Sequence, residues 1–262
     1  MTHAPGSKPR STALRIAFVN NMPEATFAEA ERRLVALLER GAGGAPLLVD
    51  RYIVESVPRA STMLQGPAAA YRRLRGLYAT RPDAIVVTGG ERTAPALAEE
   101  PLWEPLAELC DWAPKHTTSM VLSGLAAHLA AHHFEGLEPR RMVRKRRTPE
   151  PDHVDTTHVL GRDLPATVSA SCAGGEIPLS AMLARGYEPV LAGGDHWTVV
   201  TAARETCLLV LVQGLAEHGP DQPAGRGPSW ADALSANWLE EVSRRAAEEV
   251  RFSGVAAPLV AG

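Results

Sequence analysis

The chain has 262 residues, of which 45% are hydrophobic and 22% charged, a composition typical of a globular protein with a substantial core. Its formal net charge of -3 argues against general electrostatic binding to nucleic acids or anionic membranes. No apolar run approaches the ~20 residues that cross a bilayer, and residues 1–12 lack the apolar core of a signal peptide. The three cysteines stand far apart, as in a reducing compartment. We therefore predict a cytoplasmic protein without membrane or nucleic-acid partners.

The first predicted elements form a strand, a helix and a strand. Residues 1–12 are rich in proline and polar residues and are predicted to be a disordered leader. An apolar run predicts a strand over 14–19, helical spacing of leucines predicts a helix over 24–40, and a second strand follows over 47–53. This order is the signature of a βαβ unit. Small and polar residues then predict a loop over 56–67.

The rest of the chain alternates in the same way. An almost wholly apolar run over 84–88 is typical of a strand buried on both faces of a parallel sheet. Further helices are predicted over 71–78, 102–112, 125–133 and 230–250, and further strands over 118–122, 167–171, 189–191, 197–201 and 208–212. The alternation predicts one α/β domain over 13–252, with a mostly parallel central sheet flanked by helices on both faces, and a tail over 253–262.

The candidate site lies where the predicted strands end, because ligands of open α/β sheets bind at the carboxyl ends of the strands. The loops at these ends are 20–23, 88–91, 122–124 and 214–218. No metal site is predicted, because the histidines show no carboxylate at ligand spacing and are interpreted as satisfied or exposed side chains. These histidines are His128, His132, His133 and His196. Cys172 is interpreted as a small buried residue rather than a nucleophile.

Several segments, taken in chain order, carry a resemblance to a known family. A strand ends in Asn20-Asn21-Met22-Pro23, which is similar to an Asn-Leu-Met-Pro turn of that family. The other matching segments are 83–89, 102–112, 186–191, 212–214, 230 and 237–239. Together they resemble the homoserine O-acyltransferase family (homoserine O-succinyltransferase, or transsuccinylase). The resemblance implies a class I glutamine amidotransferase-like, flavodoxin-like fold, a role in amino-acid metabolism and a homodimer.

The resemblance also implies a reaction. In the family a cysteine on the turn after a strand, in Cys-Trp-Gly-Ala-Gln, takes an acyl group from acyl-CoA and passes it to homoserine. A histidine in Gly-His-Pro-Glu activates the cysteine, and the glutamate orients the histidine. Aligning Gly124 with the glycine of the first motif puts Leu122 in place of the cysteine. The second motif puts Leu215 in place of the histidine, and Glu217 matches. Because leucine neither attacks a carbonyl nor carries a proton, we expect the family's chemistry to be lost.

Two interpretations of the function follow. In the first, the chain is a non-catalytic or repurposed homologue that binds a small amino-acid-like or acyl ligand, or a partner enzyme. In the second, it is an acyl-CoA-dependent O-acyltransferase for a homoserine-like amino acid, with a rebuilt site of Ser123, His218 and Glu217. The simpler interpretation of Ser123 is a turn residue that caps a helix, and that of His218 is a loop residue. A glutaminase subunit is disfavoured, because it needs the same cysteine and histidine.

The remaining expectations concern ligands. The resemblance implies substrate binding by Asn20, Met22, Gly89, Gly90, Gly124 and Glu176. The family's arginine is missing from the stretch Ser171 to Glu176. We expect no cofactor, with acyl-CoA as a co-substrate if the protein is active. The basic run over 140–147 is interpreted first as a solvated loop and second as a phosphate site, with Arg144, Lys145 and Arg146 on the phosphates of acyl-CoA.

Overall fold

The computed structural model describes residues 13–90, 92–139, 153–164, 177–193, 197–204, 207–212 and 229–254. Within these ranges the strands are β1 (Leu14–Asn20), β2 (Leu47–Ile53), β3 (Arg72–Arg73), β4 (Ala84–Thr88), β5 (Ser119–Ser123), β6 (His153–Val154), β7 (Glu188–Gly193), β8 (Trp197–Arg204) and β9 (Cys207–Val212). The α-helices are α1 (Glu24–Gly41), α2 (Ser61–Gln65), α3 (Trp103–Trp112), α4 (Leu125–Glu135), α5 (Leu179–Leu183) and α6 (Trp230–Gly254). Short 3-10 helices are η1 (Leu74–Ala79), η2 (Leu97–Glu99), η3 (Ala113–Lys115) and η4 (Val159–Gly161).

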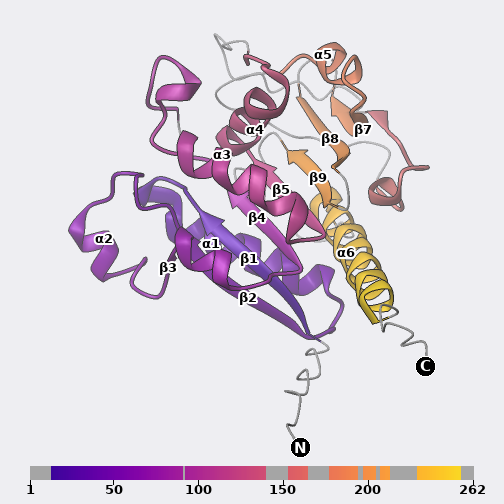
Figure 1. Ribbon diagram of the computed structural model, residues 1–262, viewed down its shortest axis with the longest axis horizontal. Helices are drawn as coiled ribbons and strands as arrows, with labels where there is room; N and C mark the ends of the chain where they lie inside the picture. Colours follow the sequence, from indigo (N-terminus) through magenta and orange to yellow (C-terminus); the bar gives the residue numbers. More distant parts are fainter. Residues whose placement is uncertain are drawn as a thin grey trace, which may run out of the picture.

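The strands form one mixed sheet in the order β3-β2-β1-β4-β5-β9-β8-β7-β6 (Figure 1). The six strands from β3 to β9 in this order are mutually parallel. The other three, β8, β7 and β6, continue the sheet as antiparallel strands. The predicted α/β class with a mostly parallel central sheet is therefore confirmed. The antiparallel part is explained by the short connections between β7, β8 and β9, which are too short for a crossover helix.

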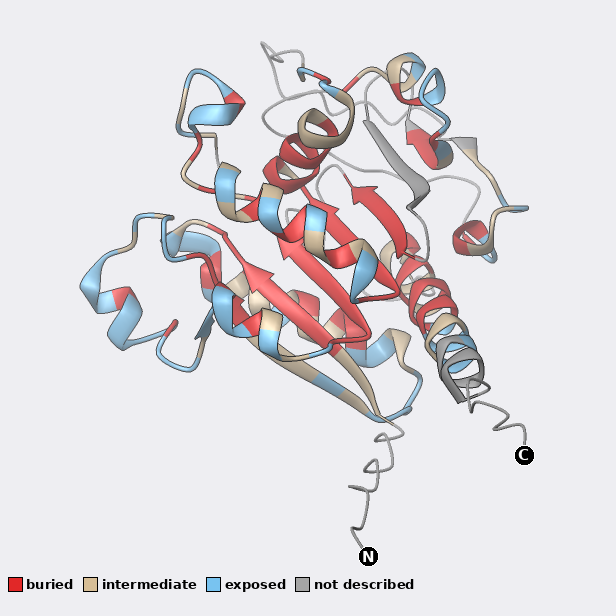
Figure 2. Ribbon diagram, viewed as in Figure 1, coloured by how far each residue is buried: buried red, intermediate tan, exposed pale blue. Residues whose placement is uncertain are grey.

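Helices cover both faces of the sheet, as predicted. Alternate residues of the central strands pack with α3 and α4 on one face and with α1 and α6 on the other. Figure 2 shows the central strands β1, β4, β5 and β9 as continuous buried segments, because helices lie against both of their faces. Burial on two faces explains why the apolar run of β4 was recognised as a parallel strand from its sequence.

Some predicted elements differ from the observed ones. The helix expected over 71–78 is replaced by β3 and the 3-10 helix η1, and the loop expected over 56–67 contains α2. Helix α6 continues to Gly254, two residues into the predicted tail. The predicted leader and the strand expected over 167–171 lie outside the described residues. In the described part of the chain, no helix has both the length and the apolar character needed to cross a membrane.

Two edges of the sheet are compared below. The carboxyl edge is the row where β1, β4, β5 and β9 end, and there the register pairs Asn20 with Thr88, Thr88 with Ser123, and Ser123 with Val212. The amino edge is the opposite row, where β4, β5 and β9 begin. The parallel register brings three of the four predicted site loops to the carboxyl edge, and the fourth, 214–218, lies outside the described residues.

Candidate functional site at the carboxyl edge

The turn between β5 and α4 is centred on Gly124. Its backbone has φ 60° and ψ -126°, a conformation that residues with a side chain rarely adopt. Its N–H donates to the carbonyl of Val212 at 2.9 Å, which holds the turn against the end of β9. A Cβ built on Gly124 would meet nothing closer than 4.0 Å. A side chain on this turn would be strained in its backbone but would have open space, as in enzymes that carry a nucleophile on such a turn.

The two residues before the turn lie on opposite faces of the sheet. Leu122 is 0% exposed and packs in the core under α3 and α4. Ser123 is 2% exposed and pairs with Val212, whose side chain lies in the core under α1 and α6. The strand-to-helix turn thus falls two residues after Leu122, the position to which the motif alignment assigned the nucleophile. The residue on the turn is Gly124, which has no side chain.

The loop after β4 fills the space beside this turn. The N–H of Gly89 donates to the carbonyl of Ser123 at 2.8 Å. A Cβ on Gly89 would lie 2.4 Å from the backbone nitrogens of Leu125 and Ala126, at the start of α4. A Cβ on Gly90 would lie 2.6 Å from the carbonyl oxygen of Asn21. The two glycines therefore connect the start of α4 with the turn after β1, and three of the predicted site glycines come together here.

Asn20 builds the turn after β1. Its side-chain amide donates to the carbonyl of Phe27 at 3.1 Å and to the Tyr71 hydroxyl at 3.2 Å. Its Oδ1 accepts from the N–H of Met22 at 3.1 Å and from the Thr88 hydroxyl at 3.3 Å. These four bonds use the hydrogen-bonding capacity of the amide, so its role in the described structure is to shape the turn. Met22 is also buried.

Two polar side chains that sequence reasoning did not assign lie at this edge without a partner. Asn21 is 3% exposed, and neither atom of its amide has a hydrogen-bond partner among the described residues. His128, one helical turn into α4, is 6% exposed, and its Nε2 has none either. Burial, with the nearby charge of Arg92, lowers the pKa of His128 to about 4, so the imidazole is neutral. The interpretation of His128 as a satisfied or exposed histidine was therefore wrong.

A guanidinium lies across the end of β1. Arg59 donates from Nη2 to the carbonyl of Asn20 at 3.0 Å and from Nη1 to that of Met22 at 3.2 Å. Its guanidinium lies over the ring of Phe27, 5.1 Å from the centroid. Burial lowers the pKa of Arg59, and carbonyls rather than a carboxylate accept its bonds. Sequence reasoning missed Arg59, because its contacts join a loop to the end of a strand that is distant in the chain.

The other histidines and cysteines named here from the described part of the chain form no reaction centre. His133 Nε2 pairs with Asp111 at 2.8 Å, and His132 Nδ1 lies 3.1 Å from Glu138. Cys110 and Cys207 are buried free thiols. Among the described residues, no group of three His, Cys, Asp or Glu side chains could hold a metal ion. The predicted site residues that lie outside the described residues are Arg144, Lys145, Arg146, Cys172, Glu176, His196, Leu215, Glu217 and His218.

A small apolar cavity of about 30 Å³ lies between the sheet and helices α1 and α6, on the face of the sheet that carries Val212. It is lined by Leu34, Leu37, Leu38, Val86, Val121, Leu160, Val210, Val212, Ala231, Leu234, Ser235 and Trp238. The one hydroxyl in this lining, that of Ser235, donates to the carbonyl of Leu37 at 3.3 Å. The cavity therefore offers no group for acid, base or nucleophilic chemistry.

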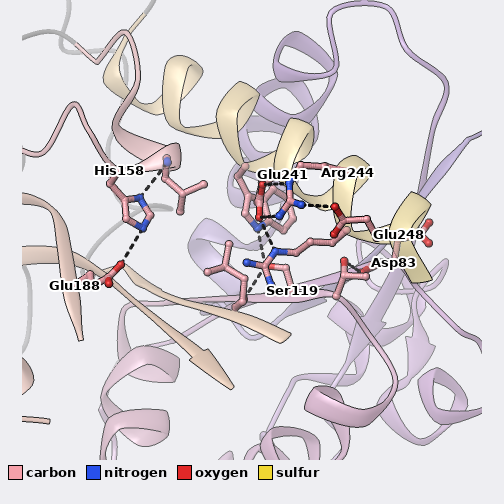
Figure 3. A network of polar contacts seen from close by, with 12 residues as sticks. Asp83, Ser119, His158, Glu188, Glu241, Arg244 and Glu248 are labelled. Atoms are coloured by element: carbon pink, nitrogen blue, oxygen red, sulfur yellow. Dashed lines mark hydrogen bonds and ion pairs between the residues drawn. The ribbon is translucent and has the colours of Figure 1, made fainter. Parts of the chain in front are cut away.

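The amino edge is built differently (Figure 3). Ser119 accepts a hydrogen bond from the indole of Trp238 at 2.8 Å and donates to the carbonyl of Leu208 at 2.7 Å. Glu241, on the next turn of α6, accepts bonds from Arg244 and Arg245. The hydrogen bonds from both arginines lower the pKa of the Glu241 carboxyl. The bond from Trp238 to Ser119 fastens α6 to the sheet, and the bonds of Glu241 stay within α6.

Comparisons with known proteins point to one family. A family model described as homoserine O-succinyltransferase matches residues 1–175. A homoserine O-succinyltransferase of Rhodopseudomonas palustris is 29% identical over 242 residues, which cover 91% of this chain and 69% of that protein. A homoserine O-succinyltransferase of Methylorubrum extorquens is 30% identical over 216 residues, which cover 82% of this chain and 63% of that protein. The chain thus spans about two thirds of the length of these relatives.

Similarity among solved structures concerns the fold alone. A ThuA-like protein from Bacteroides uniformis superimposes with a TM-score of 0.50 at 12% identity, covering 92% of this chain and 95% of that chain. This similarity and the strand order support the same α/β architecture.

Proposed function

The chain belongs to the homoserine O-succinyltransferase family, and we propose that it is a member that does not transfer acyl groups and instead binds a small acyl or amino-acid ligand at the carboxyl edge. The ligand, a partner enzyme, a homodimer and a cytoplasmic location remain predictions. Acyl-CoA is a co-substrate only under the alternative that the protein is active.

The observation that carries this proposal is the glycine on the turn between β5 and α4. When Gly124 is aligned with the cysteine of Cys-Trp-Gly-Ala-Gln, the motif continues as Leu125, Ala126, Ala127 and His128. This alignment keeps the motif's alanine at Ala127. It also puts Gly124, the residue with positive φ on the turn, where the family carries its nucleophile. It replaces the assignment of Leu122, whose side chain is buried in the core. Under either alignment the position holds no nucleophile.

The alternative with a rebuilt site has less support. The Ser123 side chain lies on the face of the sheet that carries Val212, and it is 2% exposed, so its hydroxyl is not presented to solvent in this structure. A nucleophile needs the exposed position on the turn, and the neighbouring position faces elsewhere. The positions of His218 and Glu217 lie outside the described residues, so their part in that alternative stays a prediction.

The proposal is tested by following free thiol release from succinyl-CoA and acetyl-CoA in the presence of homoserine. We expect no release above background, because removal of a nucleophile from a comparable triad costs several orders of magnitude in rate. Turnover that disappears in Ser123→Ala and in His218→Ala would contradict the proposal and establish the rebuilt site.

A restoration experiment distinguishes the two alignments. In Gly124→Cys with Leu215→His, the new thiol lies on the open turn, and we expect weak acyl transfer. The matched control is Leu122→Cys with Leu215→His, whose thiol lies in the core and should give none. The strain of a side chain at φ 60° costs about 1–3 kcal/mol, so both variants are first compared by melting temperature. Equal transfer by the two variants would contradict the assignment of the turn to Gly124.

A further inference from the structure

We propose that the carboxyl edge binds a small carboxylate, held between the first turn of α4 with His128 on one side and Asn21 on the other. This inference rests on the proposed function and deepens it, because it names the class of ligand and the residues that select it. Both side chains depart from the family motifs, which have leucine at Asn21 and glutamine at His128.

Asn21 is the first observation. The motif position is apolar in the family, and this chain puts an amide there that is 3% exposed, with neither Nδ2 nor Oδ1 paired among the described residues. A buried amide without a partner destabilises the folded protein, and such groups call for a structural explanation such as a ligand. Its neighbour Asn20 shows that the same turn satisfies an amide fully where the amide has a structural role.

His128 is the second observation, made on a different element. It stands one helical turn after Gly124, and its Nε2 is unpaired among the described residues. A neutral imidazole carries one N–H donor and one acceptor nitrogen, so His128 donates to a ligand oxygen when the proton is on Nε2. The glutamine of the motif is longer and more flexible, so the imidazole offers a more rigid donor.

The loop between these groups joins them into one site. Gly89 approaches the backbone nitrogens of Leu125 and Ala126, and Gly90 approaches the carbonyl of Asn21. Only β4 separates β1 from β5, so the two sides of the site are about 10 Å apart. No side chain projects from the turn at Gly124, and a Cβ there would meet only the carbonyl oxygen of Gly89, at 4.0 Å, so the space above the turn is open.

The charge of the edge favours an anion. The first N–H groups of α4, an 11-residue helix, have no partner within the helix and carry its positive end. Arg92 is close enough to lower the pKa of His128, and Arg59 adds a second guanidinium across β1. The nearby carboxylate of Glu100 accepts bonds from the N–H groups of Thr93 and Ala94 and from the Thr93 hydroxyl, so it is held away in its own loop. Helix N-termini with such surroundings bind carboxylates.

The experiment is a calorimetric titration of the full chain with succinate. Its uncharged analogue succinamide tests whether binding needs the negative charge. Inorganic phosphate tests whether any anion binds equally well. We expect succinate to bind and the other two to bind at least about tenfold more weakly. The variants Asn21→Leu and His128→Leu should each weaken succinate binding by about tenfold or more.

Thermal stability separates a binding role from a structural one. Because each leucine variant removes a buried unpaired group, we expect the melting temperature without ligand to rise by about 2–4 °C. Ser119→Ala is the matched control, since it removes a buried polar group that is fully paired. It should lower the melting temperature and leave the affinity for succinate unchanged.

Four results would overturn the inference: no heat with succinate, equal binding of succinamide or phosphate, leucine variants that bind succinate as tightly as the natural chain, or leucine variants that melt lower. The acyl-transfer assay is independent of these. Release of CoA thiol by the natural chain contradicts the proposed function, whereas absence of succinate binding without such release contradicts only this inference.

Discussion

The two edges of the central sheet differ in two buried side chains that have no partner in the described part of the chain, because Asn20 and Thr88 are paired at the carboxyl edge but Asn21 and His128 are not. At the amino edge Asp83, Thr117, Thr118, Ser119 and Glu241 are all buried, and each is hydrogen-bonded within the protein. At the carboxyl edge the amide of Asn21 and the Nε2 of His128 are equally buried but unpaired among the described residues. A fold that gives hydrogen-bond partners to these buried polar groups at one edge is able to do the same at the other. This contrast supports the proposal that the carboxyl edge binds a ligand, whereas the paired groups of the amino edge stabilise the fold.

The largest effect is expected where the carboxyl edge is packed most tightly. Gly89→Ala puts a methyl group 2.4 Å from two backbone nitrogens of α4, so either the loop or the helix must move. We expect a loss of about 3 kcal/mol or more in the free energy of unfolding, measured by urea denaturation. The matched control is Gly76→Ala, where nothing lies within 4 Å, and its stability should change by less than about 1 kcal/mol.

The second prediction concerns pH. The folded pKa of His128 is about 4, below its unfolded value of about 6.5, so the unfolded chain binds the proton more readily. The contribution of neutral His128 to the free energy of unfolding is fully present above pH 6.5. It is lost as the pH falls toward 4, and this loss is up to about 3 kcal/mol. We expect His128→Gln to flatten the stability curve between these pH values. An unchanged slope in that variant would show that His128 is not buried as a neutral imidazole.

The third prediction concerns the contribution of the amino edge to stability. Ser119→Ala leaves both the indole of Trp238 and the carbonyl of Leu208 without their partner, and we expect it to destabilise the protein by about 1–3 kcal/mol. Adding Trp238→Phe should cost less in this background than in the natural chain, because the indole N–H is already unpaired there. Strictly additive effects in a double-mutant cycle would contradict the link between α6 and β5.

The smallest effect is expected at the surface. Arg40 pairs with Asp232 at 2.8 Å and links α1 to α6, but its side chain is mostly exposed. We expect Arg40→Gln to change the free energy of unfolding by about 0.5 kcal/mol, and this difference should shrink at high salt. A salt-independent loss above 1 kcal/mol would mean that the ion pair is an essential link between these helices.

Sequence reasoning recovered the fold because its signals are local. The apolar runs of β4 and β5 and the leucines of α1 fix buried faces, and the strand-helix alternation fixes the parallel order. The structure brings the glycines after β4 next to the turn after β1, and their role in binding a ligand stays a prediction. The motif alignment put the family's cysteine at Leu122, two positions before the glycine with positive φ, because a positive φ leaves no mark in a motif whose other residues have changed.

The unpaired groups at the carboxyl edge were missed for a different reason. His128 lies among alanines in a buried helix, so its sequence context is that of a core histidine. Whether a buried polar atom has a partner depends on loops that are distant in the chain, such as the one that carries Arg92. Asn21 offered a signal in hindsight, because it places an amide where the family motif has a leucine.

The account depends most on the absence of a nucleophile from the turn at Gly124, and intact-mass spectrometry after mixing with succinyl-CoA tests this most directly. We predict that the natural chain gains no succinyl group, that Gly124→Cys with Leu215→His gains one, and that Leu122→Cys with Leu215→His gains none. A succinyl group on the natural chain, mapped by peptide analysis to Ser123, would contradict the account.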